Sequence, residues 1–227
     1  MIYTFYFILS LFIILRVRAD VVHNEKDLYD KLSTKKTDII LTIDSDIIVT
    51  KQITLLTTLN QLTINGNSLS TSKLIFNYPL VFNENIKDIQ IKDIHITGTL
   101  TFHNNKRITL DSVVLNGNIE SDFDNSSNEY FKFIRVVYRP IDFTSFHHCI
   151  NLQGNVEILN SKFYGGSSCE DRLLNYDGQS RYQIKIKNTY FSGEDQCSCL
   201  SITQSKDTKI EFTEFEKGLG KRDMDGG

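Results

Sequence analysis

The chain lacks tryptophan altogether and has only two prolines among its 227 residues. It also lacks a basic excess, because 25 Lys and Arg stand against 28 Asp and Glu and the formal net charge is -3. A protein without an overall basic field does not collect phosphates, so nucleic acid is not an expected partner. Ile, Asn, Lys, Ser and Thr dominate instead, and this composition favours strands and polar turns over helices.

Long hydrophobic runs are missing too, except at the N-terminus, where apolar residues extend from Ile2 to Leu15. The Val-Arg-Ala sequence at 17–19 then places small or modest side chains where a signal peptidase reads. We expect residues 1–19 to be a cleaved signal peptide, the protein to be secreted, and no membrane contact after cleavage. A retained membrane anchor is the alternative, since no Lys or Arg precedes the run, but a bilayer core requires roughly 20 apolar residues.

A ten-residue phrase recurs along the rest of the chain. It has apolar residues at positions one and three, in most copies a small polar residue at position five, and another apolar residue at position eight. The copies begin at Leu62, Ile89, Ile108, Ile134, Val156 and Ile184, and a shortened copy begins at Ile210. Small polar residues at a bend hydrogen-bond the turn backbone and each other, so position five is expected to mark a turn after each strand.

The repeat determines the expected fold. Apolar positions two residues apart are the period of a strand with one buried face. A unit this short, without a helix, cannot bury its inward side chains alone and must stack on its neighbours. The sequence therefore predicts an all-β right-handed parallel β-helix of about seven or eight coils. A β-sandwich is the alternative, but its hairpins would place strands every 8 to 12 residues or so without a longer repeating phrase.

One short helix is expected before the first coils. Asn24 is a good N-cap, Asp27 stands at the third helical position, and Leu28 and Leu32 form an apolar pair one turn apart. Such a helix would cover the open end of the stack, where an exposed strand edge invites aggregation.

The repeated phrase and this N-terminal segment together resemble the right-handed β-helix proteins of the pectin-lyase-like superfamily. The resemblance extends from Val21 to about Gly218. We expect residues 20–218 to be the β-helix domain and 219–227 to be a polar tail. No helix or aromatic plug follows the last copy, so the tail either blunts the final edge or stands where a longer solenoid has been truncated.

The resemblance implies pectate lyases, polygalacturonases and similar enzymes, which assemble Asp, Arg, Lys or His on one outer face. Positions two and four of each copy are expected to point outward. The candidate binding residues on this face are Lys92, Asp111, Arg135, Glu157, Lys185 and Lys187. Charges of alternating sign on neighbouring strands also have a purely structural explanation, since each opposite pair stabilises a sheet by roughly 0.2 to 1 kcal/mol.

Catalytic patterns are absent from the expected outer face. Glycosidases need two carboxyl groups facing one cleft, and lyases gather several acids around Ca²⁺, whereas Asp111 has no acidic neighbour on the adjacent coils. Asn188-Thr189-Tyr190 stands where a polygalacturonase would have Asn-Thr-Asp. We therefore expect an extracellular binding or structural module for glycans or surface proteins, without a cofactor. The alternative is a divergent lyase or hydrolase of acidic polysaccharide, for which Ca²⁺ would be relevant.

Four cysteines lie in the C-terminal part, and an even number in a secreted chain indicates disulfides. Cys169 and Cys197 each lie 13 residues past their coil start, so neighbouring coils are expected to bring them to bridging distance. Cys149 and Cys199 each lie 15 residues past theirs. They are expected two coils apart, about 10 Å, which is too far for a bridge without loop movement.

The sequence also contains candidate zinc ligands and a candidate glycosylation site. His147, His148 and Cys149 with Cys197 could supply zinc ligands, although their spacing matches no strong zinc pattern and the expected compartment is oxidising. Asn125 begins an Asn-Ser-Ser sequon in a polar segment and is a candidate glycosylation site.

Overall fold

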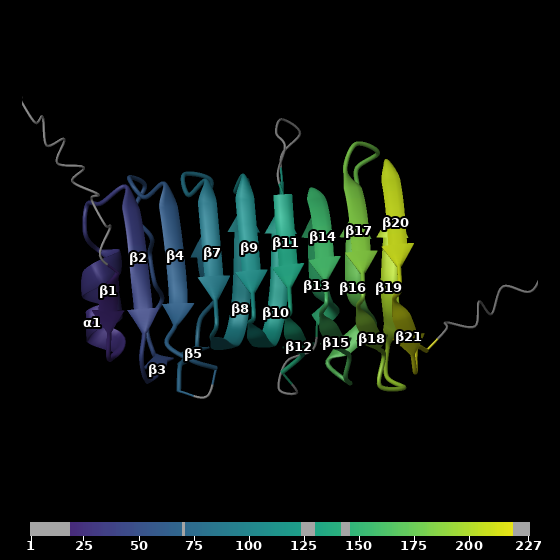
Figure 1. Cartoon of the computed structure of the whole chain (residues 1–227), viewed down its shortest axis with the longest axis horizontal. Coiled ribbons are helices and arrows are strands. Elements are labelled where there is room, and N and C mark those ends of the chain that lie inside the picture. The colour runs from purple at the N-terminus through teal and green to yellow at the C-terminus, as the bar shows by residue number, and fades with distance from the viewer. Residues whose placement is uncertain (1–18, 70, 124–129, 142–145, 220–227) are drawn as a thin grey trace, which may run out of the picture.

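The alternating apolar residues of the repeat form parallel strands that wind into a right-handed β-helix, or β-solenoid (Figure 1). The computed structural model describes residues 19–69, 71–123, 130–141 and 146–219, without the side chains of 146–148. In Figure 1 the front strands run downward while successive coils advance toward the C-terminal end, which is a right-handed path. The expected fold class is confirmed.

One parallel sheet, sheet A, receives a strand from every coil. Its strands in spatial order are β1 (Asp20–Val22), β2 (Asp38–Ile43), β4 (Gln61–Gly66), β7 (Asp88–Lys92), β9 (Arg107–Asp111), β11 (Tyr130–Ile134), β14 (Asn155–Leu159), β17 (Gln183–Lys187) and β20 (Asp207–Glu211). Each strand after β1 belongs to a new coil, eight in all. Leu62, Ile89 and Ile108 stand directly beside one another, so the first apolar position of the phrase forms one inward row.

The remaining strands form sheet B, which divides into two arms. One arm contains β3 (Asp46–Val49), β5 (Lys73–Phe76), β12 (Val137–Arg139), β15 (Lys162–Tyr164), β18 (Tyr190–Ser192) and β21 (Glu214–Glu216). The other contains β6 (Leu80–Phe82), β13 (Phe146–Gln153), β16 (Cys169–Asp177) and β19 (Ser198–Thr203). The longer strands β8 (His95–His103) and β10 (Val114–Asp122) run through both arms.

Two glycines allow β8 and β10 to bend from one arm into the other. Gly98 and Gly117 stand side by side between the segments that pair with each arm, and both have positive φ, 132° and 154°. A Cβ on Gly117 would lie 1.9 Å from the carbonyl oxygen of Gly98. Only glycine accommodates both this backbone angle and this close approach.

A left-handed residue turns the chain after sheet A in six successive coils. These residues have φ between 49° and 56° and are Asp93, Ser112, Arg135, Asn160, Asn188 and Phe212. The backbone N–H of Asn160 donates to the carbonyl of Lys187 at 3.0 Å, and the N–H of Asn188 donates to Glu211 at 3.1 Å, so the ladder continues through the corner. The side-chain amide of Asn188 also donates to Asn160 at 3.2 Å. The expected turn at position five is confirmed.

Two copies of the repeat begin elsewhere than the sequence predicted. Phe131, not Ile134, stands in register with its neighbours in sheet A, and Thr208, not Ile210, begins the last copy. Arg135 is consequently the corner residue of its coil, with φ 53°, and not an outward strand residue. The error arose because apolar residues alternate both before and after Ile134, so alternation alone does not fix the register.

The core is an elongated stack of side chains that runs the length of the solenoid. Ring centroids 4.6 to 5.8 Å apart connect Phe82, Phe102, Phe131, Phe133, Phe163, Phe191 and Phe215 in sequence. Such offset and edge contacts are the arrangements that aromatic rings prefer.

The expected helix is present as α1 (Glu25–Leu32) at the N-terminal end. The side chain of Asn24 accepts a hydrogen bond from the N–H of Asp27 at 3.0 Å, and Leu28 and Leu32 are buried against the first coils. At the other end Ile210 and Phe215 are each more than 40% exposed. Across the described ranges, no helix is long and apolar enough to cross a bilayer.

Candidate functional site

The outer face of sheet A carries most of the residues expected to bind. Alternation places Lys92, Asp111, Glu157, Lys185 and Lys187 outward on β7, β9, β14 and β17. The strand register sets Lys92 directly opposite Asp111 and Glu157 directly opposite Lys185. Arg135, the sixth candidate, lies at the edge of this face because it is the corner residue of its coil.

Acidic and basic side chains are paired toward the N-terminal half of the face. Arg107 bonds Asp88 through Nε and Nη2, and the guanidinium of Arg135 bonds Asp111. The hydrogen bond from Arg107 lowers the pKa of Asp88, against the opposing effect of burial. No acidic residue stands opposite another in the paired strands of sheet A that the structure describes. No two carboxyl groups are therefore direct cross-strand neighbours in these paired strands.

Basic residues gather toward the C-terminal half of the same face. We call Lys132, Lys185, Lys187 and Lys209 the lysine cluster. Two carboxylates lie among them: Glu157 is 2.7 Å from Lys132, and Glu211 is 3.1 Å from Lys209 and 4.0 Å from Lys187. Four ammonium groups against two carboxylates leave a local charge of about +2 on a chain whose formal net charge is -3.

Lys185 is distinguished from the other members of the cluster by its neighbours. It stands directly opposite Lys209 and forms no ion pair with any residue in the described part of the chain. Like charges directly opposite each other destabilise a sheet. Glu157 opposite Lys185 and Glu211 beside Lys209 offset part of this repulsion, and the lysine cluster keeps its positive excess.

Glu157 is an ionised carboxylate that holds Lys132, one member of the lysine cluster, in place. Burial opposes its ionisation, but hydrogen bonds from Lys132 and Tyr130 outweigh that effect and hold the pKa below its ordinary value of 4.5. In return, burial and the bond to Glu157 raise the pKa of the Tyr130 hydroxyl. The carboxylate is therefore charged at neutral pH, and it holds Lys132 in place while Lys185 extends into solvent.

A shallow hollow of about 130 Å³ lies within this half of the face. Lys185, Lys187 and Lys209 line it together with Glu157 and Glu211. The arrangement can hold an anionic group from outside, since ammonium groups are strong donors to carboxylate and sulfate oxygens.

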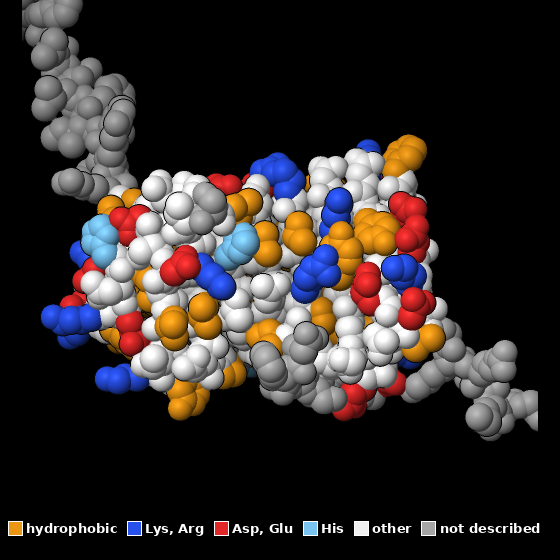
Figure 2. Space-filling view, turned by 90° about the horizontal axis from the view of Figure 1, so that it is seen from below, with side chains coloured by type: hydrophobic (Ala, Val, Ile, Leu, Met, Phe, Trp, Pro, Cys, Tyr) orange, Lys and Arg blue, Asp and Glu red, His pale blue; other side chains and the backbone are white. Residues whose placement is uncertain are grey.

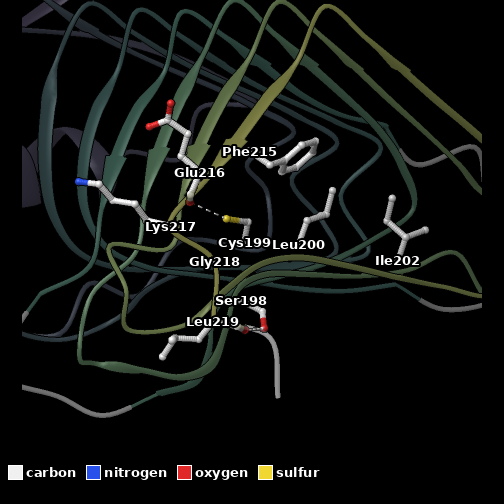
Figure 3. A pocket seen from close by; sticks show the side chains of 9 residues that line it. All are labelled: Ser198, Cys199, Leu200, Ile202, Phe215, Glu216, Lys217, Gly218 and Leu219. Carbon is white, nitrogen blue, oxygen red and sulfur yellow. Dashed lines mark hydrogen bonds between the residues drawn. The ribbon is translucent and has the colours of Figure 1, made fainter. Parts of the chain in front are cut away.

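A larger hollow, about 540 Å³, lies instead at the C-terminal end of the solenoid (Figure 3). Its walls include the apolar side chains of Leu200, Ile202 and Phe215, from the last two described coils. Figure 3 shows the side chains of Glu216 and Lys217 pointing away from these residues. Without converging polar groups, this hollow is the open end of the core rather than a site for chemistry.

The disulfide expected between Cys169 and Cys197 is wrong. Cys149 is bonded to Cys169, with 5.2 Å between their Cα atoms, whereas Cys197 and Cys199 are free and buried. Burial raises the pKa of both free thiols, which makes them poor nucleophiles at neutral pH.

Strand register explains the different pairing. Counting residues from each coil start places Cys169 beside Cys197 only if the corners within the two coils have equal lengths. In β16 and β19, however, Arg172 stands opposite Ser198, so the residue beside Cys197 is Asp171 and not Cys169. β13 pairs with β16 on its other side, with a register irregularity between Phe146 and His148, and on that side the Cα atoms of Cys149 and Cys169 are 5.2 Å apart. Cys149 and Cys199 are indeed on strands separated by β16.

The structure excludes one of the candidate zinc ligands and does not describe the candidate glycosylation site. Cys149 is used by the disulfide and is not available as a zinc ligand. The side chains of His147 and His148, and all of Asn125, lie outside what the structure describes. Among the described residues, no three His, Cys, Asp or Glu side chains come together as a metal site would require.

The fold places the chain in the class of β-solenoid proteins with a long parallel sheet as an accessible face. No family model and no curated protein matches the sequence. Of the lysine cluster, the sequence indicated Lys185 and Lys187. It missed Lys132 and Lys209, because both lie in the two copies whose register was displaced. The alternating Phe131 and Phe133, both buried in β11, were the signal that could have given the correct register for Lys132.

Proposed function

We propose that the protein is a secreted binding module that holds acidic glycans on the outer face of sheet A. The observation that carries this proposal is the pair formed by Lys185 and Lys209 on adjacent strands. Strands in a sheet lie about 4.8 Å apart, so one carboxylate or sulfate group can contact both ammonium groups. A bound anion would remove the repulsion that the free protein retains.

Secretion is the second part of the proposal. The hydrophobic N-terminal segment 1–19 supports it, and so does the Cys149–Cys169 disulfide, because such bonds persist in oxidising compartments. Relationship to the pectin-lyase-like superfamily is proposed on the same footing, from the β-solenoid and the repeated phrase. A polysaccharide or a cell-surface protein that bears one is the expected partner.

Binding is favoured over cleavage of the same polymer. The alternative lyase or hydrolase would need several carboxylates together, for a Ca²⁺ ion or for acid and base roles. On the described part of sheet A, Asp88, Asp111, Glu157 and Glu211 are each paired with a basic side chain, including the two that line the hollow of the lysine cluster. A binding module needs no such group and no cofactor.

Charge changes within the lysine cluster test the proposal. We expect Lys185→Gln and Lys209→Gln each to weaken binding of an oligogalacturonate about tenfold, since each removes a charge-assisted contact. Glu157→Gln should strengthen binding a few-fold, because it removes a negative charge from the same hollow. Isothermal titration calorimetry at low and at physiological salt measures both effects.

The matched control is Lys26→Gln, on the exposed side of α1 at the far end of the solenoid. It changes the net charge equally and should leave affinity unchanged. The proposal fails if the unaltered protein does not bind, or if Lys26→Gln weakens binding as much as Lys185→Gln. It gains support if Lys185→Gln loses affinity while its thermal stability is unchanged or higher.

A further inference from the structure

Phe212 occupies a position that folding alone does not explain. It is the corner residue of the last described coil, has φ 49°, and leaves 81% of its surface exposed. A bulky side chain in the left-handed region is strained, and an exposed ring gains little from burial in return. The equivalent corners of the two preceding coils carry Asn160 and Asn188, which suit this backbone far better.

A hollow of about 270 Å³ lies beside this ring. The residues that line it include Asn160, Lys162, Asn188, Tyr190 and Glu214. The space-filling view from below shows basic, acidic and hydrophobic side chains interspersed near the C-terminal end, at the right of the picture (Figure 2). Amides, a carboxylate and aromatic rings around one hollow are the groups that recognise hydroxyls and apolar ring faces.

Phe212, which lines this hollow, lies beside a member of the lysine cluster. Asn188 follows Lys187 directly in the chain, and Phe212 follows Glu211. The ammonium nitrogen of Lys187 lies 5.9 Å from the centroid of the Phe212 ring, and Lys187 lines the hollow of the lysine cluster. A chain held by its acidic groups on sheet A would meet the Phe212 ring on passing around the corner.

We propose that Phe212 is the stacking platform of a sugar subsite, on which one pyranose ring of an acidic glycan lies. This inference rests on the proposed function and adds a ring-stacking contact, which distinguishes sugar rings that carry carboxylates from other polyanions. The C–H face of the sugar covers the exposed ring, while Asn188 and Glu214 bond its hydroxyls.

Two probes separate this subsite from simple charge attraction. Oligogalacturonate offers both rings and carboxylates, and poly-glutamate of matched charge offers carboxylates alone. We expect Phe212→Ala to weaken oligogalacturonate binding about fivefold to tenfold and to leave poly-glutamate binding unchanged. Lys185→Gln should weaken both. Phe212→Tyr, which keeps a flat ring, should bind oligogalacturonate as the unaltered protein does.

The fold of each variant is checked by its thermal unfolding midpoint, which Phe212→Ala should not lower, since the ring is exposed. The stacking subsite is overturned if Phe212→Ala binds oligogalacturonate normally while Lys185→Gln does not; the proposed function then survives. It is also overturned if Phe212→Ala weakens both probes equally. Absence of oligogalacturonate binding by the unaltered protein would refute the subsite and the proposed function together.

Discussion

Replacing Phe163 by alanine is expected to lower the free energy of unfolding by about 3 to 5 kcal/mol, the cost typical of removing a buried aromatic ring. Phe163 is fully buried, and its ring centroid lies 5.0 Å from that of Phe191, 5.8 Å from Phe133 and 6.1 Å from Tyr138. Tyr138 and Phe191 belong to the strands hydrogen-bonded on either side of β15, and Phe133 belongs to sheet A, so the cavity cannot easily collapse. Urea unfolding followed by circular dichroism measures the loss.

Phe212→Ala is the matched control for that substitution, because it removes the same ring from an exposed corner. Its effect on the free energy of unfolding should stay within about 0.5 kcal/mol. Equal losses for the two variants would contradict the stacked core, since only one of these rings is placed within it.

Reduction of the Cys149–Cys169 bond is the second large expected effect. The bond closes a loop with a sequence separation of 20, and cross-linking a loop of that size stabilises the folded state by about 3 kcal/mol. Adding a thiol reductant should therefore lower the unfolding midpoint of the unaltered protein in urea. The double variant Cys149→Ser, Cys169→Ser should unfold early with or without reductant.

The other two cysteines provide the control. In the double variant Cys197→Ala, Cys199→Ala the disulfide remains, so sensitivity to the reductant should persist even if the loss of buried sulfur lowers stability somewhat. If sensitivity disappeared there and persisted without Cys149, the pairing in the structure would be incorrect.

Much of the fold could be predicted because a solenoid repeats its signal. The apolar pair at the start of each phrase, as at Ile184 and Ile186, reports one buried strand face wherever it recurs. The short helix could also be predicted, since Asn24 caps a residue only three positions away and Leu28 belongs to a local apolar pattern. Both features depend on local periodicity and capping, which a sequence displays directly.

Register and disulfide pairing were harder, because they depend on how much chain each corner takes up. Around Ile134 two alternating patterns overlap, and only the pairing of β11 with β9 and β14 decides between them. Because of that displaced register, the sequence analysis placed Arg135 on the outer face and missed Lys132. The same kind of error in the last coil left Lys209 and Phe212 unrecognised. Outward residues of regular coils, such as Glu157 and Lys185, were placed correctly.

The most direct test of the account is to locate the bound glycan by lysine footprinting. The whole chain is acetylated with and without oligogalacturonate, and the modification of each lysine is read by mass spectrometry. The account predicts that Lys185, Lys187 and Lys209 become several-fold less reactive when the glycan binds, while the distant, exposed Lys26 and Lys51 do not change. Protection of the distant lysines instead, or equal protection of all of them, would contradict a binding site on the outer face of sheet A.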